Sequence, residues 1–359
     1  KKPMGSIAFP AIPASGLWAA GVRVSLGAQL IVDGSSLDAN YGSGIEVEGQ
    51  GTSLEVRNTL ITETRLLPNG DPSGYGIHSN MNASMKIEHS AITQSGDTAV
   101  VVFGEEDEVE VLSSLISEND KRGLACESSC DIELVQSSLA HNRDSGLFIN
   151  APNAQFLVEQ SLIVGTQPNA TGQFGHGVDV NYGATCTLRR TAIVDNHHLG
   201  VVAYSADTVV TLEQSLVEST QPLIGGLPGA AVWVQEGGRV QVTGSTIRDN
   251  LDFGLGFLWG AGEVTSSIIE GVMSSPGHAY GDGLMATGSV VSVRNSRMRD
   301  CERSGLFFDG SGGELAQNHI SGSQYGLVTQ GLPGPSVAPD NLMEDNEESR
   351  LEGGELRVP

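Results

Sequence analysis

The chain has 359 residues, of which 19 are Lys or Arg and 43 are Asp or Glu, so its formal net charge is −24 at pH 7. A charge this negative argues against nucleic acid or an anionic membrane as a partner, because phosphate binding needs concentrated Lys and Arg. It also makes an anionic polysaccharide a poor ligand unless calcium bridges the two. No run of about 18 apolar residues occurs, so we expect no membrane span.

Residues 1–21 precede the first repeat and contain three prolines. We expect this segment to cap an array of repeats, because the open end of such an array exposes unpaired strand edges. No hydrophobic stretch of the signal-peptide type follows Lys1, so we expect a mature or trimmed chain.

From residue 22 to residue 330 one phrase recurs: apolar-x-apolar, two residues, Ser or Thr, one residue, and then Ile, Leu or Val. Its twelve anchors are spaced by 22 to 31 residues: Ser35, Thr59, Ser90, Ser114, Ser137, Ser161, Thr191, Ser215, Ser245, Ser267, Ser296 and Asn318. Repetition of this kind is typical of a repeat architecture. Each unit carries two apolar runs of period 2 and none of period 3.6, which favours strands. Equivalent strands of successive coils can then pair in parallel.

The fuller phrase Ser/Thr-x-Ile/Leu-x-x-Asn-x-x-x-Gly-Leu/Val-x-apolar resembles the repeat of the right-handed parallel β-helix family, the pectate-lyase-like superfold. This resemblance implies an all-β solenoid of about 12 coils, forming a single domain with terminal caps. No specific enzyme family of the superfold matches. The expected organisation is a cap at 1–21, the β-helix at 22–330, and an acidic tail or cap at 331–359, where Pro333 and Pro335 break the repeat.

The Ser/Thr ladder is expected to be structural, because hydroxyls stacked in a bend can pair with one another and with nearby backbone. An Asn follows the anchor by five residues in five short units: Asn40, Asn119, Asn142, Asn196 and Asn250. We expect each Asn to take a left-handed turn conformation and the Gly after it to allow the next bend.

The four cysteines do not make a disulfide framework. Cys186 and Cys301 lie about four coils apart, near 19 Å, which is too far for a disulfide. Cys126 and Cys130 flank a short bend and could close a small loop, but their spacing does not decide whether they do.

Four units are longer than the others, with insertions at 63–75, 165–176, 219–229 and 271–282. Insertions at one coil position map to loops on one side of a solenoid, often the binding side. The strands beside these loops present an outward face that is unusually apolar and aromatic, which marks either a ligand surface or a face covered by loops or a terminal segment. The binding candidates on this face and rim are Phe148, Asn181, Tyr182, Tyr204, Trp233, Tyr280 and Phe307.

The catalytic candidates are His78, His176, Asp179, His278 and Asp282. The phrase Gly-His-Gly at His176 superficially resembles that of polygalacturonases, but the chain has no Asp-Asp pair and no Arg-x-Lys phrase. The acid and base that hydrolysis requires are therefore missing. A lyase or epimerase needs a base and a group that neutralises the sugar carboxylate, and none of the four lysines falls on this face. No metal or cofactor is expected; calcium is conceivable on Asp179 and Asp282, without a calcium-loop motif.

The sequence thus predicts a secreted or cell-surface module that binds a polysaccharide or a protein surface through the loop rim and the outward aromatic face. The alternative is a polysaccharide lyase, hydrolase or epimerase that uses the same face. Convergence of His78, His176, Asp179 and His278 in one groove would favour the enzyme. The oligomeric state stays open.

Overall fold

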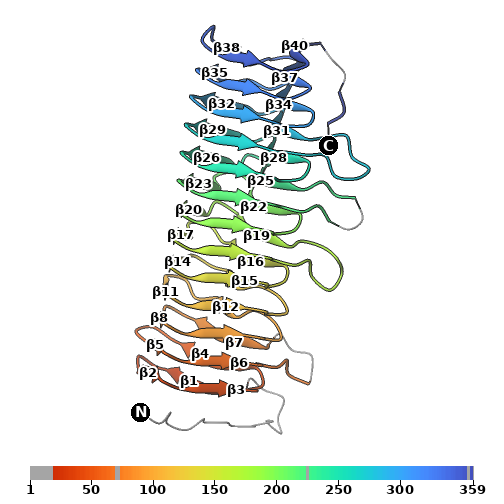
Figure 1. Cartoon of the computed structure of the whole chain (residues 1–359). Helices are drawn as coiled ribbons and strands as arrows, with labels where there is room; N and C mark the ends of the chain where they lie inside the picture. The colour runs from red at the N-terminus through yellow and green to blue at the C-terminus, as the bar shows by residue number, and fades with distance from the viewer. Residues whose placement is uncertain (1–18, 69–72, 224–225, 354–355, 359) are drawn as a thin grey trace.

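The computed structural model describes residues 19–68, 73–223, 226–353 and 356–358. These residues form forty strands in three parallel sheets of 14, 13 and 13 strands, stacked along one axis (Figure 1). Each coil contributes one strand to each sheet, which confirms the parallel β-helix and agrees with a count near 12 coils. Residues 1–18, most of the expected N-terminal cap, lie outside the described residues.

The first sheet carries the outward face from which the site is built. Its strands are β1 (Ala20–Ser25), β4 (Ser43–Glu48), β7 (Tyr75–Asn80), β10 (Val100–Val102), β13 (Leu124–Cys126), β16 (Ser145–Asn150), β19 (His176–Asn181), β22 (Leu199–Tyr204), β25 (Ala230–Gln235), β28 (Phe253–Leu258), β31 (Asp282–Thr287), β34 (Ser304–Asp309), β37 (Tyr325–Gln330) and β40 (Glu348–Glu352).

The second sheet holds the apolar pairs that precede each anchor. Its strands are β2 (Gln29–Asp33), β5 (Ser53–Arg57), β8 (Ser84–Glu88), β11 (Asp107–Leu112), β14 (Cys130–Val135), β17 (Gln155–Glu159), β20 (Thr185–Arg189), β23 (Val209–Glu213), β26 (Arg239–Thr243), β29 (Ala261–Thr265), β32 (Val290–Arg294), β35 (Glu314–Ala316) and β38 (Ser336–Val337).

The third sheet follows the anchors with short strands. They are β3 (Ser36–Asp38), β6 (Leu60–Thr62), β9 (Ala91–Thr93), β12 (Leu115–Ser117), β15 (Ser138–Ala140), β18 (Leu162–Val164), β21 (Ala192–Val194), β24 (Leu216–Glu218), β27 (Thr246–Arg248), β30 (Ile268–Glu270), β33 (Arg297–Arg299), β36 (His319–Ser321) and β39 (Leu342–Glu344). Because β38, β39 and β40 extend all three sheets, the solenoid continues beyond residue 330, into the segment expected to be a tail or cap.

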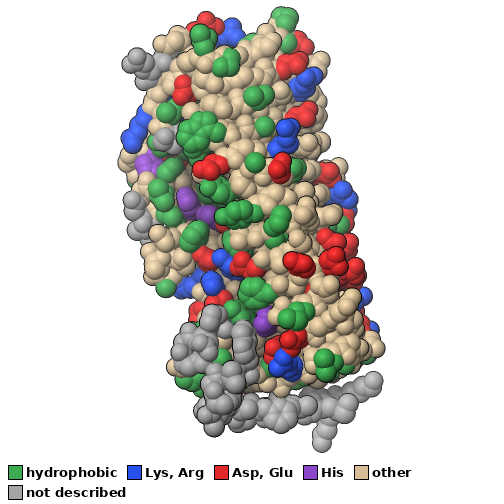
Figure 2. Space-filling model, turned by 180° about the vertical axis from the view of Figure 1, so that it is seen from behind, with side chains coloured by type: hydrophobic (Ala, Val, Ile, Leu, Met, Phe, Trp, Pro, Cys, Tyr) green, Lys and Arg blue, Asp and Glu red, His purple; other side chains and the backbone are tan. Residues whose placement is uncertain are grey.

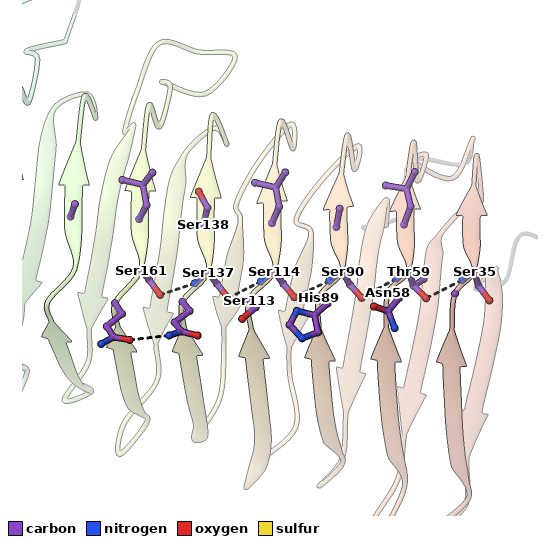
Figure 3. Close-up of a pocket in the computed structure, with 18 of the residues that line it drawn as sticks. Ser35, Asn58, Thr59, His89, Ser90, Ser113, Ser114, Ser137, Ser138 and Ser161 are labelled. Carbon is purple, nitrogen blue, oxygen red and sulfur yellow. Dashed lines mark hydrogen bonds between the residues drawn. The ribbon is translucent and has the colours of Figure 1, made fainter. Parts of the chain in front are cut away.

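The Ser/Thr anchors form a hydrogen-bonded ladder at the corner between the second and third sheets (Figure 3). The backbone N–H of Ser90 donates to Ser114 Oγ at 3.1 Å, and that of Ser114 donates to Ser137 Oγ at 3.0 Å. Each hydroxyl in turn donates to a carbonyl, as Ser90 Oγ does to Glu88 at 2.8 Å. The hydroxyls therefore satisfy buried backbone groups, which confirms that the ladder is structural.

The Asn ladder is structural too, but the left-handed backbone conformation predicted for each Asn occurs at the residue before it. The left-handed residue is the one before each Asn, such as His141 with φ 54°. Asn142 itself is buried, and its Oδ1 accepts a hydrogen bond of 2.7 Å from Asn119 Nδ2. The Gly that follows is needed for space rather than for a bend: a Cβ on Gly146 would lie 2.8 Å from the carbonyl oxygen of Gly177.

Inside the solenoid, the inward residues of the three sheets form one continuous apolar core. Cys126 and Cys130 form a disulfide, which settles the alternative that their spacing left open. Cys186 and Cys301 are free and buried, and burial raises the pKa of each thiol to about 12. Among the described residues, no helix has the length and hydrophobicity to cross a membrane.

Candidate functional site

Three of the four long loops meet over the outer face of the first sheet. They precede β19, β25 and β31, which are separated by the shorter coils of β22 and β28, and they project from the same side of the solenoid (Figure 1). The loops bring Phe174, Leu227 with Pro228, and Tyr280 to the wall of one pocket of about 500 Å³. The alternate spacing of the insertions therefore gives each loop room to contribute to a shared site.

The floor of this pocket is set by parallel pairing, which lines up equivalent outward residues of successive strands. Asp179 lies beside Val202, and Val202 beside Trp233. The next outward row places Asn181 beside Tyr204, which lies beside Gln235. The full lining consists of Phe174, His176, Asp179, Asn181, His198, Leu199, Val202, Tyr204, Leu227, Pro228, Trp233, Gln235 and Tyr280. Hydrophobic side chains run along this face with histidines among them (Figure 2).

A chain of hydrogen bonds links four polar residues of the lining. Asn181 Nδ2 donates to Asp179 Oδ1 at 3.0 Å, and Asp179 Oδ2 lies 3.0 Å from His176 Nδ1. His176 Nε2 then lies 3.1 Å from His198 Nδ1. His176, Asp179 and Asn181 are among the residues predicted from the sequence, whereas His198 is not. His198 directly precedes β22, so the alternation of inward and outward residues along a strand does not identify it.

Burial and neighbouring charge set the protonation of this chain. Burial by itself raises the pKa of Asp179, but the charge and hydrogen bond of His176, the hydrogen bond from Asn181 and the charge of Arg122 together bring it below its ordinary value. Burial, followed by the nearby His176, lowers the pKa of His198 to about 4. At neutral pH the pocket therefore holds an anionic Asp179 and an uncharged His198.

Aromatic side chains form the remaining wall, and two of them, Trp233 and Tyr204, are held by neighbouring residues. Trp233 Nε1 donates to Gln235 Oε1 at 2.9 Å. The indole lies across Gly256, where a Cβ would come within 2.3 Å of its ring. The Tyr204 hydroxyl donates to Glu236 Oε2 at 3.1 Å. These contacts fix the orientation of two rings that a ligand would meet.

Three of the five catalytic candidates, His78, Asp282 and His278, stay outside the lining of the pocket. His78 is on β7, four strands from His176 along the first sheet, where its ring packs against Tyr75 and Phe103. Burial lowers the pKa of His78 to about 4. Asp282 is fully buried and ion-paired with Arg303, whose Nε lies 2.8 Å from Asp282 Oδ1. The Asp282 carboxylate is thus engaged in an ion pair, and its strand, β31, lies four strands from β19, which carries Asp179.

His278 belongs to a Ser–His–Asp cluster that fastens loops. Ser275 Oγ and Asp252 Oδ2 both contact His278 Nδ1, at 2.8 and 3.0 Å, while Nε2 lies 3.1 Å from the Gly226 carbonyl. A serine nucleophile needs the hydroxyl and the carboxylate on opposite ring nitrogens. Asp252 also accepts from the backbone N–H of Gly229. The cluster therefore ties the loops before β25 and β31 together. Of the residues whose convergence would favour an enzyme, only His176 and Asp179 share the pocket, while His78 and His278 lie outside its lining.

The predicted binding residues divide into three groups. Asn181, Tyr204, Trp233 and Tyr280 line the pocket. Phe148 is half-buried beside it, with the Arg122 guanidinium 3.5 Å above its ring, and Tyr182 is 60% exposed in the turn after β19, outside the lining.

Phe307, expected to face a ligand, is instead fully buried. Leu356 and Val358 pack against the cluster that contains it, so the C-terminal segment covers this end of the outward face. Within the described residues, no group of three or more His, Cys, Asp or Glu side chains is arranged to hold a metal ion.

A larger groove of about 1000 Å³ follows the hydroxyl ladder at the opposite corner of the coils (Figure 3). It is a shallow channel whose hydroxyls already accept from one backbone group and donate to another. The pocket between the loops is thus the better candidate for a ligand-binding site, because its polar atoms lie together in a smaller pocket lined by aromatic rings.

Comparison with known proteins agrees with this architecture. A family model described as a right-handed β-helix region matches residues 20–189 and again residues 176–342. Among solved structures, the chain is similar to the periplasmic alginate epimerase AlgG, with 8% identity, a TM-score of 0.52, and coverage of 92% of this chain and 78% of that one. It is also similar to the A-module of the Azotobacter vinelandii mannuronan C-5 epimerase AlgE4, with 13% identity, a TM-score of 0.46, and coverage of 94% and 88%. No curated protein matches the chain. Identities this low show a shared fold alone.

Proposed function

Since this chain belongs to the right-handed β-helix family, we propose that it binds a carbohydrate chain in the pocket between the three inserted loops. The proposal is drawn from the pocket because the scaffold does not by itself dictate an activity. The observation that carries the proposal is the lining, in which Tyr204, Trp233 and Tyr280 stand beside polar side chains. Aromatic rings offer flat apolar surfaces to the C–H faces of a sugar ring, and the polar groups can bind its hydroxyls.

The size of the site supports a glycan over a protein partner. A pocket of about 500 Å³ lies within the range of small-ligand sites. Protein interfaces are usually broader and flatter, burying roughly 800 Å² per partner. On the outward face beyond the pocket, Met285, Phe307 and Val328 are already covered, which leaves less apolar surface for a protein to occupy.

We place the protein outside the cell, either secreted or on the cell surface. The disulfide between Cys126 and Cys130 supports this location, because such bonds persist in oxidising compartments. A glycan-binding site is also in keeping with a surface exposed to extracellular polysaccharide.

A second candidate is a carbohydrate-active enzyme on the same face, favoured by the chain from Asp179 through His176 to His198. This chain can hold an imidazole nitrogen as a proton acceptor. A lyase or epimerase also needs a positive group beside the substrate carboxylate, and a hydrolase needs a second carboxylate across the bond. In the described lining, Asp179 is the only carboxylate and neither Lys nor Arg is present. Binding without cleavage is therefore the better-supported function.

The proposal is tested by applying the whole chain to a glycan array and comparing it with two tryptophan variants. Trp233→Ala removes a ring from the pocket wall, whereas Trp259→Ala removes a ring that is 61% exposed and lies outside the lining. We expect binding by the wild type and by Trp259→Ala, and at least tenfold weaker binding by Trp233→Ala. The absence of any glycan ligand, or equal loss in both variants, would contradict the proposal.

The enzyme alternative is tested on the same polysaccharides. New reducing ends would report hydrolysis, and unsaturated products that absorb in the ultraviolet would report lyase activity; both are measured with and without calcium. Epimerisation is followed by proton NMR of the recovered polymer. Product formation that Trp233→Ala or His198→Ala abolishes would replace binding by catalysis as the function of the pocket.

A further inference from the structure

The hydrogen-bond chain couples the position of the proton on His198 to that on His176. An ionised carboxylate can only accept, so Asp179 requires a proton on His176 Nδ1. With that single proton on His176, its other nitrogen, Nε2, is an acceptor and receives the proton of His198 Nδ1. His198 Nε2 is left with its lone pair. Among the described residues no group hydrogen-bonds to this nitrogen, so it can accept a hydrogen bond from a ligand.

Other polar atoms of the lining suit a hydroxyl group. Asn181 uses its amide N–H on Asp179, which leaves its carbonyl oxygen as an acceptor. Gln235 uses its carbonyl oxygen on Trp233, which leaves its amide N–H as a donor. A sugar hydroxyl both donates and accepts, so it can satisfy this mixture, whereas a carboxylate offers acceptors only.

Arg122, whose charge acts on Asp179, is already paired with carboxylates. Arg122 contacts Asp144 Oδ2 at 3.2 Å and Glu127 Oε1 at 2.5 Å, and it lies over the Phe148 ring. These two carboxylates outnumber the single guanidinium, and Asp179 adds a third negative charge nearby. Arg122 and these carboxylates together therefore carry no net positive charge that would attract an acidic sugar.

Two more arginines lie against Tyr280 without joining the lining. Arg303 is committed to Asp282, and its Nη1 donates to the carbonyl of Arg357 at 2.7 Å. Arg357 lies 5.8 Å from the Tyr280 ring centroid and is exposed, where an ion pair with a ligand contributes little. The net charge of −24 opposes the approach of a polyanion as well.

On these grounds, and resting on the proposed function, we infer that the pocket selects uncharged sugar residues, with His198 accepting a hydrogen bond from a sugar hydroxyl, and discriminates against uronic acids. The structural neighbours named as alginate epimerases share the fold, but the polar groups that line this pocket suit an uncharged polysaccharide.

Matched pairs of oligosaccharides test this selection. In each pair the linkage and ring configuration are the same and only C6 changes, from CH₂OH to carboxylate: β-1,4-mannohexaose with its hexamannuronate, cellohexaose with its hexaglucuronate, and α-1,4-galactohexaose with its hexagalacturonate. Calorimetric titration of the whole chain at low salt, with and without calcium, gives the Kd of each. We expect at least one uncharged member to bind, and its uronate partner to bind at least tenfold more weakly.

The outcomes separate this inference from the function on which it rests. A uronate that binds as tightly as its uncharged partner, or more tightly, overturns the selection while leaving glycan binding intact. If only uronates bind and Arg357→Gln abolishes their binding, the rim cation rather than the lining decides specificity, and the inference is again wrong. No binding by any member of the pairs or by any glycan on the array overturns both.

Discussion

Replacing Asp179 with Asn should reverse the direction of the hydrogen-bond chain that ends in the pocket. Asn is nearly isosteric, and its Oδ1 can still accept from Asn181. Its Nδ2 must donate, however, so His176 Nδ1 becomes an acceptor and the His176 proton moves to Nε2. His198 Nδ1 then accepts, and its own proton is carried by Nε2, which faces a ligand as a donor.

The size of the effect follows from the exchange of one acceptor for one donor. A sugar hydroxyl can also accept, so an uncharged glycan should lose at most one hydrogen bond, which is about 1 kcal/mol or roughly fivefold in Kd. A uronate should gain, because its carboxylate now meets an N–H group and one negative charge fewer. The ratio of the two Kd values in a matched pair should therefore fall from at least tenfold to near unity.

Two measurements check this reasoning. Two-bond ¹H–¹⁵N correlation spectra at pH 7.5, with His198→Gln for assignment, report which nitrogen of His198 carries the proton, and calorimetry gives the Kd values. We expect Nδ1–H in the wild type and Nε2–H in Asp179→Asn. Nε2–H in the wild type, a doubly protonated His176, or an unchanged tautomer in the variant would refute the chain of inference.

Three further predictions concern the wall, the pH dependence and the cysteines. Gly256→Ala should displace the Trp233 indole, because the added Cβ would lie 2.3 Å from that ring. Glycan binding should weaken several-fold while the thermal midpoint stays nearly unchanged. Tryptophan fluorescence reports the displacement of the indole, and calorimetry reports the binding and the midpoint. The pKa of His78 is about 4 in the folded chain, against 6.5 in the unfolded chain. Between these pH values the unfolded chain binds more protons, so the free energy of unfolding falls as the pH falls. Between pH 7.5 and pH 5, His78→Gln should therefore lose about 2 kcal/mol less of its free energy of unfolding than the wild type, as measured by chemical denaturation. Thiol titration of the denatured chain should find two reactive groups without reductant and four with it, because Cys126 and Cys130 are bonded; four without reductant would contradict the disulfide.

Much of the fold was predictable because its determinants repeat. Each anchor places the same apolar neighbours inward, so one alignment of the repeats assigned inner and outer residues along the chain. The register of Asp179, Val202 and Trp233 agrees with that assignment. The positions of the long loops were also readable, since insertions interrupt the repeat at one point of the coil.

The parts that escaped prediction depend on contacts between distant segments. Phe307 has the pattern of an exposed residue, and nothing in its own repeat indicates that Leu356 will cover it. His278 and Asp282 resemble site residues, but their partners come from other coils. His198 was missed for a different reason: it enters the site from a turn, where the alternation of strand residues does not apply.

The central claim is that the three inserted loops enclose a glycan on the first sheet. A crystal structure of the whole chain with the tightest uncharged glycan from the array tests it most directly. We expect a sugar ring against Trp233, with a hydroxyl within hydrogen-bonding distance of His198 Nε2. A glycan bound instead in the groove along Ser90 and Ser114, or on any surface away from the loops, would contradict it.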